Sequence, residues 1–234
     1  MAVVGRNEAR ADDAASELSG AGPGRAVSLC GDVCSSGDAE RILEAVQSEL
    51  GCPSGIVITT GLGIRGHRAL LEADDLDWED TFNDVLLGTV RACRAAVPVL
   101  IGGGGGAIVT TAAFSVRAPK PNQVAYASLK SAVATFTKSI AKAYGGHGVR
   151  ANCVCPGATE TEVLAQMRLT LARERGWPVE EALERVMTQE WGMQVALQRA
   201  GRPEEIGDVI AFLLSDRASY VSGALLNIDG GTDF

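Results

Sequence analysis

Short apolar segments alternate with segments of helical periodicity along the whole 234-residue sequence. The strand-like segments lie at about residues 2–5, 26–29, 55–59, 107–111, 149–154 and 224–228. Between them, helical spacing predicts helices at about 8–18, 38–50, 78–100, 125–143 and 203–214. This alternation predicts an α/β fold, a doubly wound parallel sheet covered by helices on both faces. Ligands of such sheets bind at the carboxyl ends of the strands.

The length and composition favour one domain over residues 1–234, without an internal repeat or a linker. The formal net charge of −8 and the lack of a basic tract argue against nucleic acid as a partner. No apolar run of about 18 residues and no signal peptide stand out, so we expect a cytoplasmic protein that makes no membrane contact.

The six cysteines show no C-x-x-C spacing. Cys153 and Cys155 lie two apart in an apolar strand, so their side chains share one face of it. The two histidines lie far from them, so we interpret the cysteines as reduced, buried thiols and predict no metal site.

Tyr126 and Lys130 are four residues apart in a predicted helix and therefore share a face of it. An ammonium group beside a phenol favours the phenolate and lowers a pKa that is normally about 10. Such a tyrosine exchanges protons with an alcohol or a carbonyl near neutral pH. The alternative is a solvent-exposed pair without a role.

The motifs that follow this pair are more specific. They are Val-Arg-Ala-Asn-Cys-Val-Cys-Pro-Gly at 149–157, Thr161, Gly-Arg-Pro-Glu-Glu-Ile at 201–206, Tyr-Val-Ser-Gly at 220–223 and Asp-Gly-Gly at 229–231. In this order the chain resembles the short-chain dehydrogenase/reductase family from about residue 2 to residue 232. The resemblance implies a Rossmann-like sheet and hydride transfer between NADP(H) and a carbonyl or secondary alcohol. It makes Tyr126 the acid/base, with Lys130 lowering its pKa and hydrogen-bonding the nicotinamide ribose.

The sequence departs from the family at its start. The family's first strand, its Gly-x-x-x-Gly-x-Gly turn and its first helix have no counterpart, because the chain begins at what resembles the second strand. We expect unpaired strand edges inside the sheet. Two explanations stand open: a fragment whose start was assigned at the internal Met1, or a natural short form that has lost cofactor binding and has no cofactor.

The active-site positions depart as well. Ala113 stands where the family has its serine, and Val85 stands where the family has an asparagine. Of the family's Asn-Asn-Ala-Gly segment, only Gly61 remains. Since alanine offers no hydroxyl, Thr111 and Ser115 are the candidate replacement donors.

Five further positions match cofactor contacts of the family. Arg6 follows the strand whose end meets the adenosine ribose, and a basic residue there favours NADP over NAD; a surface arginine in a turn is the alternative. Asp32 resembles the adenine-contacting aspartate. Pro156, Gly157 and Thr161 resemble the loop beside the nicotinamide.

Residues 158–200 match the family's substrate-closing region in position. Their apolar residues fit an apolar lid over a substrate, or the core packing of amphipathic helices: Met167, Leu169, Leu171, Trp177, Val179, Val186, Met187, Trp191 and Met193. The helix at 78–100 and the helix of Tyr126 carry many alanines. Because the family assembles through these two helices, we expect a homo-oligomer, a dimer or a tetramer.

Two other functions stay open. The first is a cofactor-independent isomerase, cyclase or lyase that uses Tyr126 and Lys130 for proton transfer. The second is a catalytically silent subunit kept as an oligomerisation partner. The first alternative explains the missing glycine turn and Ala113 together.

Overall fold

The computed structural model describes residues 1–61 and 67–233. Strands and helices alternate through the first two thirds of the chain: β1 (Ala2–Gly5), α1 (Glu8–Gly20), β2 (Val27–Cys30), α2 (Asp38–Leu50), β3 (Gly55–Ile58), α3 (Asp75–Thr81), α4 (Gly88–Gly102), β4 (Gly106–Thr111), α5 (Val124–Tyr144) and β5 (Val149–Pro156). The rest forms α6 (Glu162–Arg175), α7 (Val179–Gln189), β6 (Gln194–Val195), α8 (Pro203–Leu214), β7 (Leu225–Ile228) and β8 (Thr232–Asp233). The predicted α/β class is confirmed, and the predicted bounds are close to the observed ones.

The parallel strands form two separate ladders. The larger has the order β3-β4-β5-β7, and the smaller joins β1 to β2. Within the described residues no ladder connects β1 or β2 to β3, so β1 and β3 each have an edge without a hydrogen-bonded partner strand. A short antiparallel pair, β6 with β8, was not predicted from the sequence.

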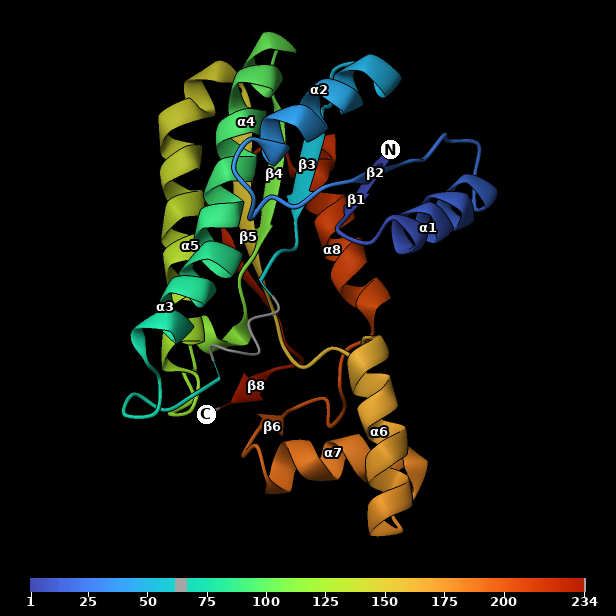
Figure 1. The fold of residues 1–234 in the computed structure, drawn as a ribbon, viewed down its shortest axis with the longest axis vertical. Coiled ribbons are helices and arrows are strands. Elements are labelled where there is room, and N and C mark those ends of the chain that lie inside the picture. Colours follow the sequence, from blue (N-terminus) through green and yellow to red (C-terminus); the bar gives the residue numbers. More distant parts are fainter. Residues whose placement is uncertain (62–66, 234) are drawn as a thin grey trace.

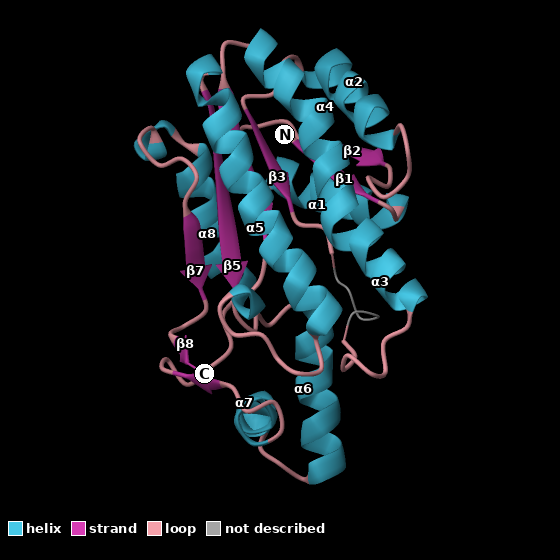
Figure 2. Cartoon of the chain, turned by 90° about the vertical axis from the view of Figure 1, so that its left-hand side faces the viewer, coloured by secondary structure: helices cyan, strands magenta, loops and turns pink. Residues whose placement is uncertain are grey.

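Helices cover both faces of the larger ladder (Figures 1 and 2). Side chains of α4 and α5 pack with Ile108 on one face, and Leu213 of α8 packs with Val109 on the other. Ile108 and Val109 are both fully buried because successive side chains of a strand point to opposite faces. A strand buried on both faces reads as a continuous apolar run, which is why β4 was recognisable in the sequence.

The predicted helix at 78–100 consists of three parts. It begins in α3, where Asp74 and Asp77 form a capping box. It continues as a π-helix over Phe82–Leu87 and ends in α4. The spacing of apolar residues predicted the helix but gave no sign of the π-helical segment.

The combined helix Asp75–Gly102 is long and apolar enough to cross a membrane by length and composition alone, with a mean hydropathy of 1.6 over its most apolar window. In this fold its Cys93, Val97 and Leu100 are buried against the sheet. A core helix of an α/β domain has the same composition.

The separation of the two ladders predicts uneven backbone protection. Two-stranded ladders are marginally stable on their own, so we expect the amides of β1 and β2 to exchange with solvent about tenfold faster or more than those of β4 and β5. Hydrogen exchange read by mass spectrometry or NMR measures this. Equal protection of β1 and β4 would show that the sheet is continuous in solution.

Candidate active site

Tyr126 and Lys130 lie in the first two turns of α5, on its inner face. The Lys130 ammonium donates to the carbonyl oxygen of Thr60 at 3.1 Å and to that of Thr111 at 2.9 Å. It lies 5.6 Å from the centre of the Tyr126 ring. Lys130 is only 2% exposed, so the alternative of a solvent-exposed pair is wrong.

Burial dominates the titration of both side chains. It raises the pKa of Tyr126 to about 12, with a further contribution from the Cys155 thiol. It lowers the pKa of Lys130 to about 8, although Cys153 and Cys155 act in the opposite direction. Burial thus acts against the predicted lowering of the Tyr126 pKa in the protein alone.

His67 was not predicted from the sequence as part of this site. Its ring lies edge-on to the Tyr126 ring, with the centroids 5.1 Å apart. Burial lowers the pKa of His67, which favours its neutral form. A lone histidine carries no sequence signal, since its contact with Tyr126 forms only in the folded chain.

Two hydroxyl groups lie on either side of Ala113 in the sequence and are buried without a partner. Thr111 ends β4, and Ser115 lies in a 3-10 turn over Phe114–Val116. Neither oxygen has a hydrogen-bond partner among the described residues. Buried hydroxyls are nearly always paired in folded proteins, so both are available to a bound molecule.

Gly61 lies between Lys130 and the π-helix, with φ at +96°. A Cβ atom at this position would lie 3.2 Å from Nζ of Lys130 and 3.1 Å from Cγ2 of Val85. Val85 itself is fully buried and packs with Leu129 and Val133. Only glycine tolerates both this φ and this close approach.

The predicted cofactor positions lie near the ends of strands in both ladders. Pro156 ends β5, Gly157 follows it, and the exposed Thr161 caps α6. A Cβ atom on Gly157 would lie 2.8 Å from Cα of Asp229, so the two chain segments nearly touch.

The other two cofactor positions belong to the smaller ladder. Arg6 is exposed directly after β1. The Asp32 carboxylate accepts the backbone N–H of Cys34 at 2.9 Å, within the turn after β2. The fold therefore brings the Thr111 carbonyl, Lys130 and Tyr126 together and leaves Arg6 and Asp32 beside a separate ladder.

The structure also tests the prediction that the six cysteines are reduced, buried thiols; two of them, Cys153 and Cys155, lie on β5. All six cysteines are free. Cys93, Cys153 and Cys155 are buried, whereas Cys30 and Cys52 are exposed, so the prediction of burial was wrong for those two. The described residues contain no group of three or more His, Cys, Asp or Glu side chains able to hold a metal ion.

Helices α6 and α7 extend beyond the carboxyl ends of the strands, with β6 and β8 beside them (Figure 1). Leu183 and Met187 of α7 are buried with Met193 and pack against Phe114. The apolar stripe of α7 is thus core packing. Met167 and Leu169 of α6 are instead exposed.

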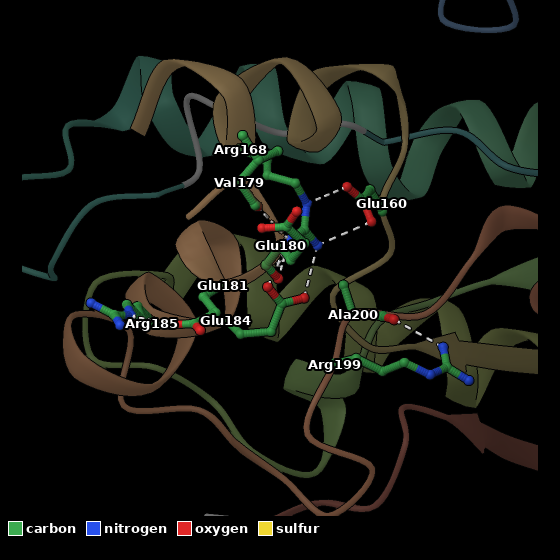
Figure 3. Close-up of polar contacts among 9 residues, drawn as sticks. All are labelled: Glu160, Arg168, Val179, Glu180, Glu181, Glu184, Arg185, Arg199 and Ala200. Atoms are coloured by element: carbon green, nitrogen blue, oxygen red, sulfur yellow. Dashed lines mark hydrogen bonds and ion pairs between the residues drawn. The ribbon is translucent and has the colours of Figure 1, made fainter. Parts of the chain in front are cut away.

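A largely buried cation, the side chain of Arg168, joins α6 to α7. Figure 3 shows the Arg168 guanidinium between the carboxylates of Glu160 and Glu184. It donates to Glu184 at 2.7 and 2.8 Å and to the carbonyl oxygen of Glu180 at 2.9 Å. Burial alone would raise the pKa of Glu184, but the hydrogen bonds from Arg168 outweigh it and hold that pKa below its ordinary value.

Comparison with known proteins finds relatives that are named dehydrogenases and reductases. The family described as Enoyl-(Acyl carrier protein) reductase matches residues 1–233. Meso-2,3-butanediol dehydrogenase of Serratia marcescens is 31% identical over 208 residues, which are 89% of this chain and 75% of that protein.

Solved structures agree in fold. L-sorbose reductase from Gluconobacter frateurii, solved with NADPH and L-sorbose, has a TM-score of 0.89 at 27% identity, covering 98% of this chain and 85% of that one. A short chain oxidoreductase from Pseudomonas aeruginosa PAO1, solved with NADPH and containing an atypical catalytic center, has a TM-score of 0.86 at 26% identity over the same shares.

The chain belongs to the short-chain dehydrogenase/reductase family and has its Rossmann-like α/β fold. The relatives are dehydrogenases and reductases, so this chain is an enzyme of the NAD(P)-dependent oxidoreductase class.

Replacing Arg168 by Met removes the cation and leaves two acidic groups partly buried. Breaking a buried pair in this way costs about 3–5 kcal/mol. Because the Glu160 side chain is 31% exposed, we expect about 2–3 kcal/mol here, measured by urea denaturation at pH 7.

Arg185→Met is the matched control, since it breaks an exposed pair with Glu181 within one helix, worth about 0.3–0.5 kcal/mol. The depressed pKa of Glu184 contributes stability above its ordinary value of 4.5 that is lost as the pH falls through the lower folded value. The difference between wild type and Arg168→Met therefore shrinks below that pH. An equal effect of both substitutions would contradict the structural role of Arg168.

Proposed function

We propose that this enzyme transfers a hydride between NADP(H) and a ketone or secondary alcohol, with Tyr126 as the acid/base. The observation that carries the proposal is the ammonium of Lys130, which two carbonyl groups fix beside the Tyr126 ring. This pair offers a proton donor and a cation that stabilises the phenolate, as carbonyl reduction requires.

The residues do the following in the direction of reduction. The phenol of Tyr126 donates its proton to the substrate oxygen as the carbonyl carbon receives the hydride, and the phenolate left behind is stabilised by the Lys130 ammonium. Thr111 and Ser115 donate hydrogen bonds to that oxygen in place of the absent serine at Ala113. The nicotinamide cofactor, when bound, supplies the hydride.

The cofactor assignment draws on residues and relatives. Lys130, Gly61, Pro156, Gly157 and Thr161 are suited to hold the nicotinamide end. The solved relatives named above contain NADPH. The exposed guanidinium of Arg6, directly after β1, is suited to a 2′-phosphate and favours NADP over NAD, with Asp32 at the adenine.

The missing first strand of the family is part of the same proposal. We infer that the family's first strand and its glycine-rich turn have no counterpart in residues 1–234, and that the break between β1 and β3 marks their place. The break supports this, as does the share of 85% of the L-sorbose reductase chain that is matched.

The named substrates of two relatives, a butanediol and L-sorbose, are a secondary alcohol and a ketose. They support a small molecule with a ketone or secondary alcohol as the substrate class. Nothing in the comparisons supports a cofactor-independent isomerase, cyclase or lyase, or a silent subunit. A cytoplasmic location stays a prediction.

Tyr126→Phe removes the proton donor and keeps the ring, so we expect NADPH oxidation with a panel of small ketones to fall below detection. Tyr144→Phe, at the far end of α5, is the matched control. Thr111→Val and Ser115→Ala remove one donor each, and loss of an oxyanion donor costs about 10²–10³ in kcat.

NADPH fluorescence titration of the same proteins separates binding from chemistry. We expect saturable binding that Tyr126→Phe leaves unchanged. Absence of NADPH and NADH binding by folded wild-type protein would overturn hydride transfer by this chain, and an unchanged rate in Tyr126→Phe would remove the tyrosine from the mechanism.

We also propose a homo-oligomer, a dimer or a tetramer, assembled through α4 and α5. Light scattering at micromolar concentration measures the mass directly. We expect at least twice the chain mass of 24.3 kDa. A monomer would contradict the assembly.

A further inference from the structure

Two threonine hydroxyls form a short hydrogen-bonded chain behind Lys130. The Thr60 and Thr89 hydroxyl oxygens lie 3.2 Å apart, and the Thr89 hydroxyl donates to the carbonyl oxygen of Val85 at 2.9 Å. A hydroxyl has one hydrogen to donate. Because Thr89 gives its hydrogen to Val85, the hydrogen between the two threonines comes from Thr60.

One end of this pair of hydrogen bonds is Thr60, whose backbone holds the Lys130 ammonium. The backbone carbonyl of Thr60 accepts from the Lys130 ammonium. The β3 ladder ends at Ile58, paired with Thr110. Thr60 therefore lies beyond the sheet, and the Thr89 hydroxyl is the side-chain contact that fixes it.

The other end of the chain is anchored in the π-helix. Val85 lies within Phe82–Leu87, and Thr89 lies in the first turn of α4. Thr89 is 3% exposed and Val85 is fully buried. Single π-helical turns inside longer helices are frequent at functional sites, and here the Val85 carbonyl receives a side-chain hydroxyl of the same helix.

We propose that Thr89 is a positioning residue for the reaction: through Thr60 it holds the carbonyl group that orients the Lys130 ammonium toward Tyr126. For its catalytic consequence this inference rests on the proposed function. The hydrogen-bond geometry behind it stands independently, because it concerns the state of Lys130 in the protein alone.

The direction of the effect on Lys130 follows from the groups around it. The titratable groups that face it are Tyr126 on the same helix and Cys153 and Cys155 on β5, with His67 beyond the Tyr126 ring. The hydrogen bond with Cys155 and the nearby Lys130 ammonium are among the causes that lower the pKa of Cys153 to about 7, so the Cys153 thiolate also favours the charged amine. The carbonyls of Thr60 and Thr111 accept hydrogen bonds from the charged amine and favour it together with these thiols, so release of one carbonyl lowers the pKa of Lys130 further.

The experiment compares Thr89→Val with Thr89→Ser. Valine keeps the branched shape and lacks the hydroxyl, whereas serine keeps the hydroxyl. In protein with 13C at lysine Cε, an NMR titration gives the pKa of Lys130, assigned by Lys130→Met. We expect Thr89→Val to lower this pKa and Thr89→Ser to leave it near the wild-type value.

Activity gives a second readout. We expect Thr89→Val to lower kcat about tenfold, with less change in KM for NADPH, since misplacement of a catalytic group acts on the chemical step. The alkaline limb of the kcat profile moves to lower pH together with the pKa of Lys130. Thr89→Ser restores both.

The chain provides a matched control in Thr137. Its hydroxyl lies 2.6 Å from that of Thr110 and donates to the Val133 carbonyl of its own helix at 2.8 Å, so the same motif occurs away from the Lys130 carbonyls. Thr110 is fixed within the β4 ladder. Thr137→Val therefore carries the cost of a lost buried hydroxyl without the effect on Lys130.

Thr60→Val is the second variant, for the case that Thr89→Val fails to fold. It removes the Thr60 hydroxyl, which donates to Thr89, and Thr60 is only half-buried. A lowered pKa of Lys130 in Thr89→Val or Thr60→Val, absent from Thr137→Val, supports the proposal. An unchanged pKa in the folded variants overturns it. Wild-type protein without reductase activity would refute the proposed function, and the NMR titration would still decide the role of Thr89.

Discussion

The buried ammonium of Lys130 is the constraint on which the site depends. Removing a charge from water is costly unless hydrogen bonds replace the solvent. Here the replacements are carbonyl groups at Thr60 and Thr111, which follow β3 and end β4. They meet at one amine because the two strands are adjacent and parallel, with Ile58 opposite Thr110. The register of the sheet thus sets the position of the cation, and the cation sets the face of α5 that carries Tyr126.

Much of this arrangement was readable from the sequence because it is local. Four-residue spacing placed Tyr126 and Lys130 on one face, and the apolar run of β4 located the strand below them. The carbonyl groups that hold Lys130 were not readable, since every residue has one. The π-helix, the contact of His67 with Tyr126 and the pairing of Arg168 with Glu160 and Glu184 likewise arise from tertiary packing, which periodicity does not encode.

Ala113 stands where the resemblance predicts a serine, and two buried hydroxyl groups flank it in the sequence. Thr111 and Ser115, two residues to either side, have buried oxygens that find no hydrogen-bond partner among residues 1–61 and 67–233. A protein that needed neither hydroxyl would reach a lower free energy with apolar residues there, because an unpaired buried hydroxyl costs about 1–3 kcal/mol. Their retention is therefore consistent with a polar group of a bound molecule completing both hydrogen bonds.

The π-helix links these observations to the break in the sheet. Val85 stands where the resemblance predicts an asparagine, and its backbone carbonyl accepts a hydrogen bond from the Thr89 hydroxyl. That contact reaches Thr60, and Thr60 belongs to the segment after β3, the strand at the open edge of the larger ladder. An edge strand lacks hydrogen bonds on one side, and its following loop is correspondingly less restrained. The hydrogen bond from the buried Thr89 to Thr60 therefore restrains the backbone at the place where the sheet restrains it least.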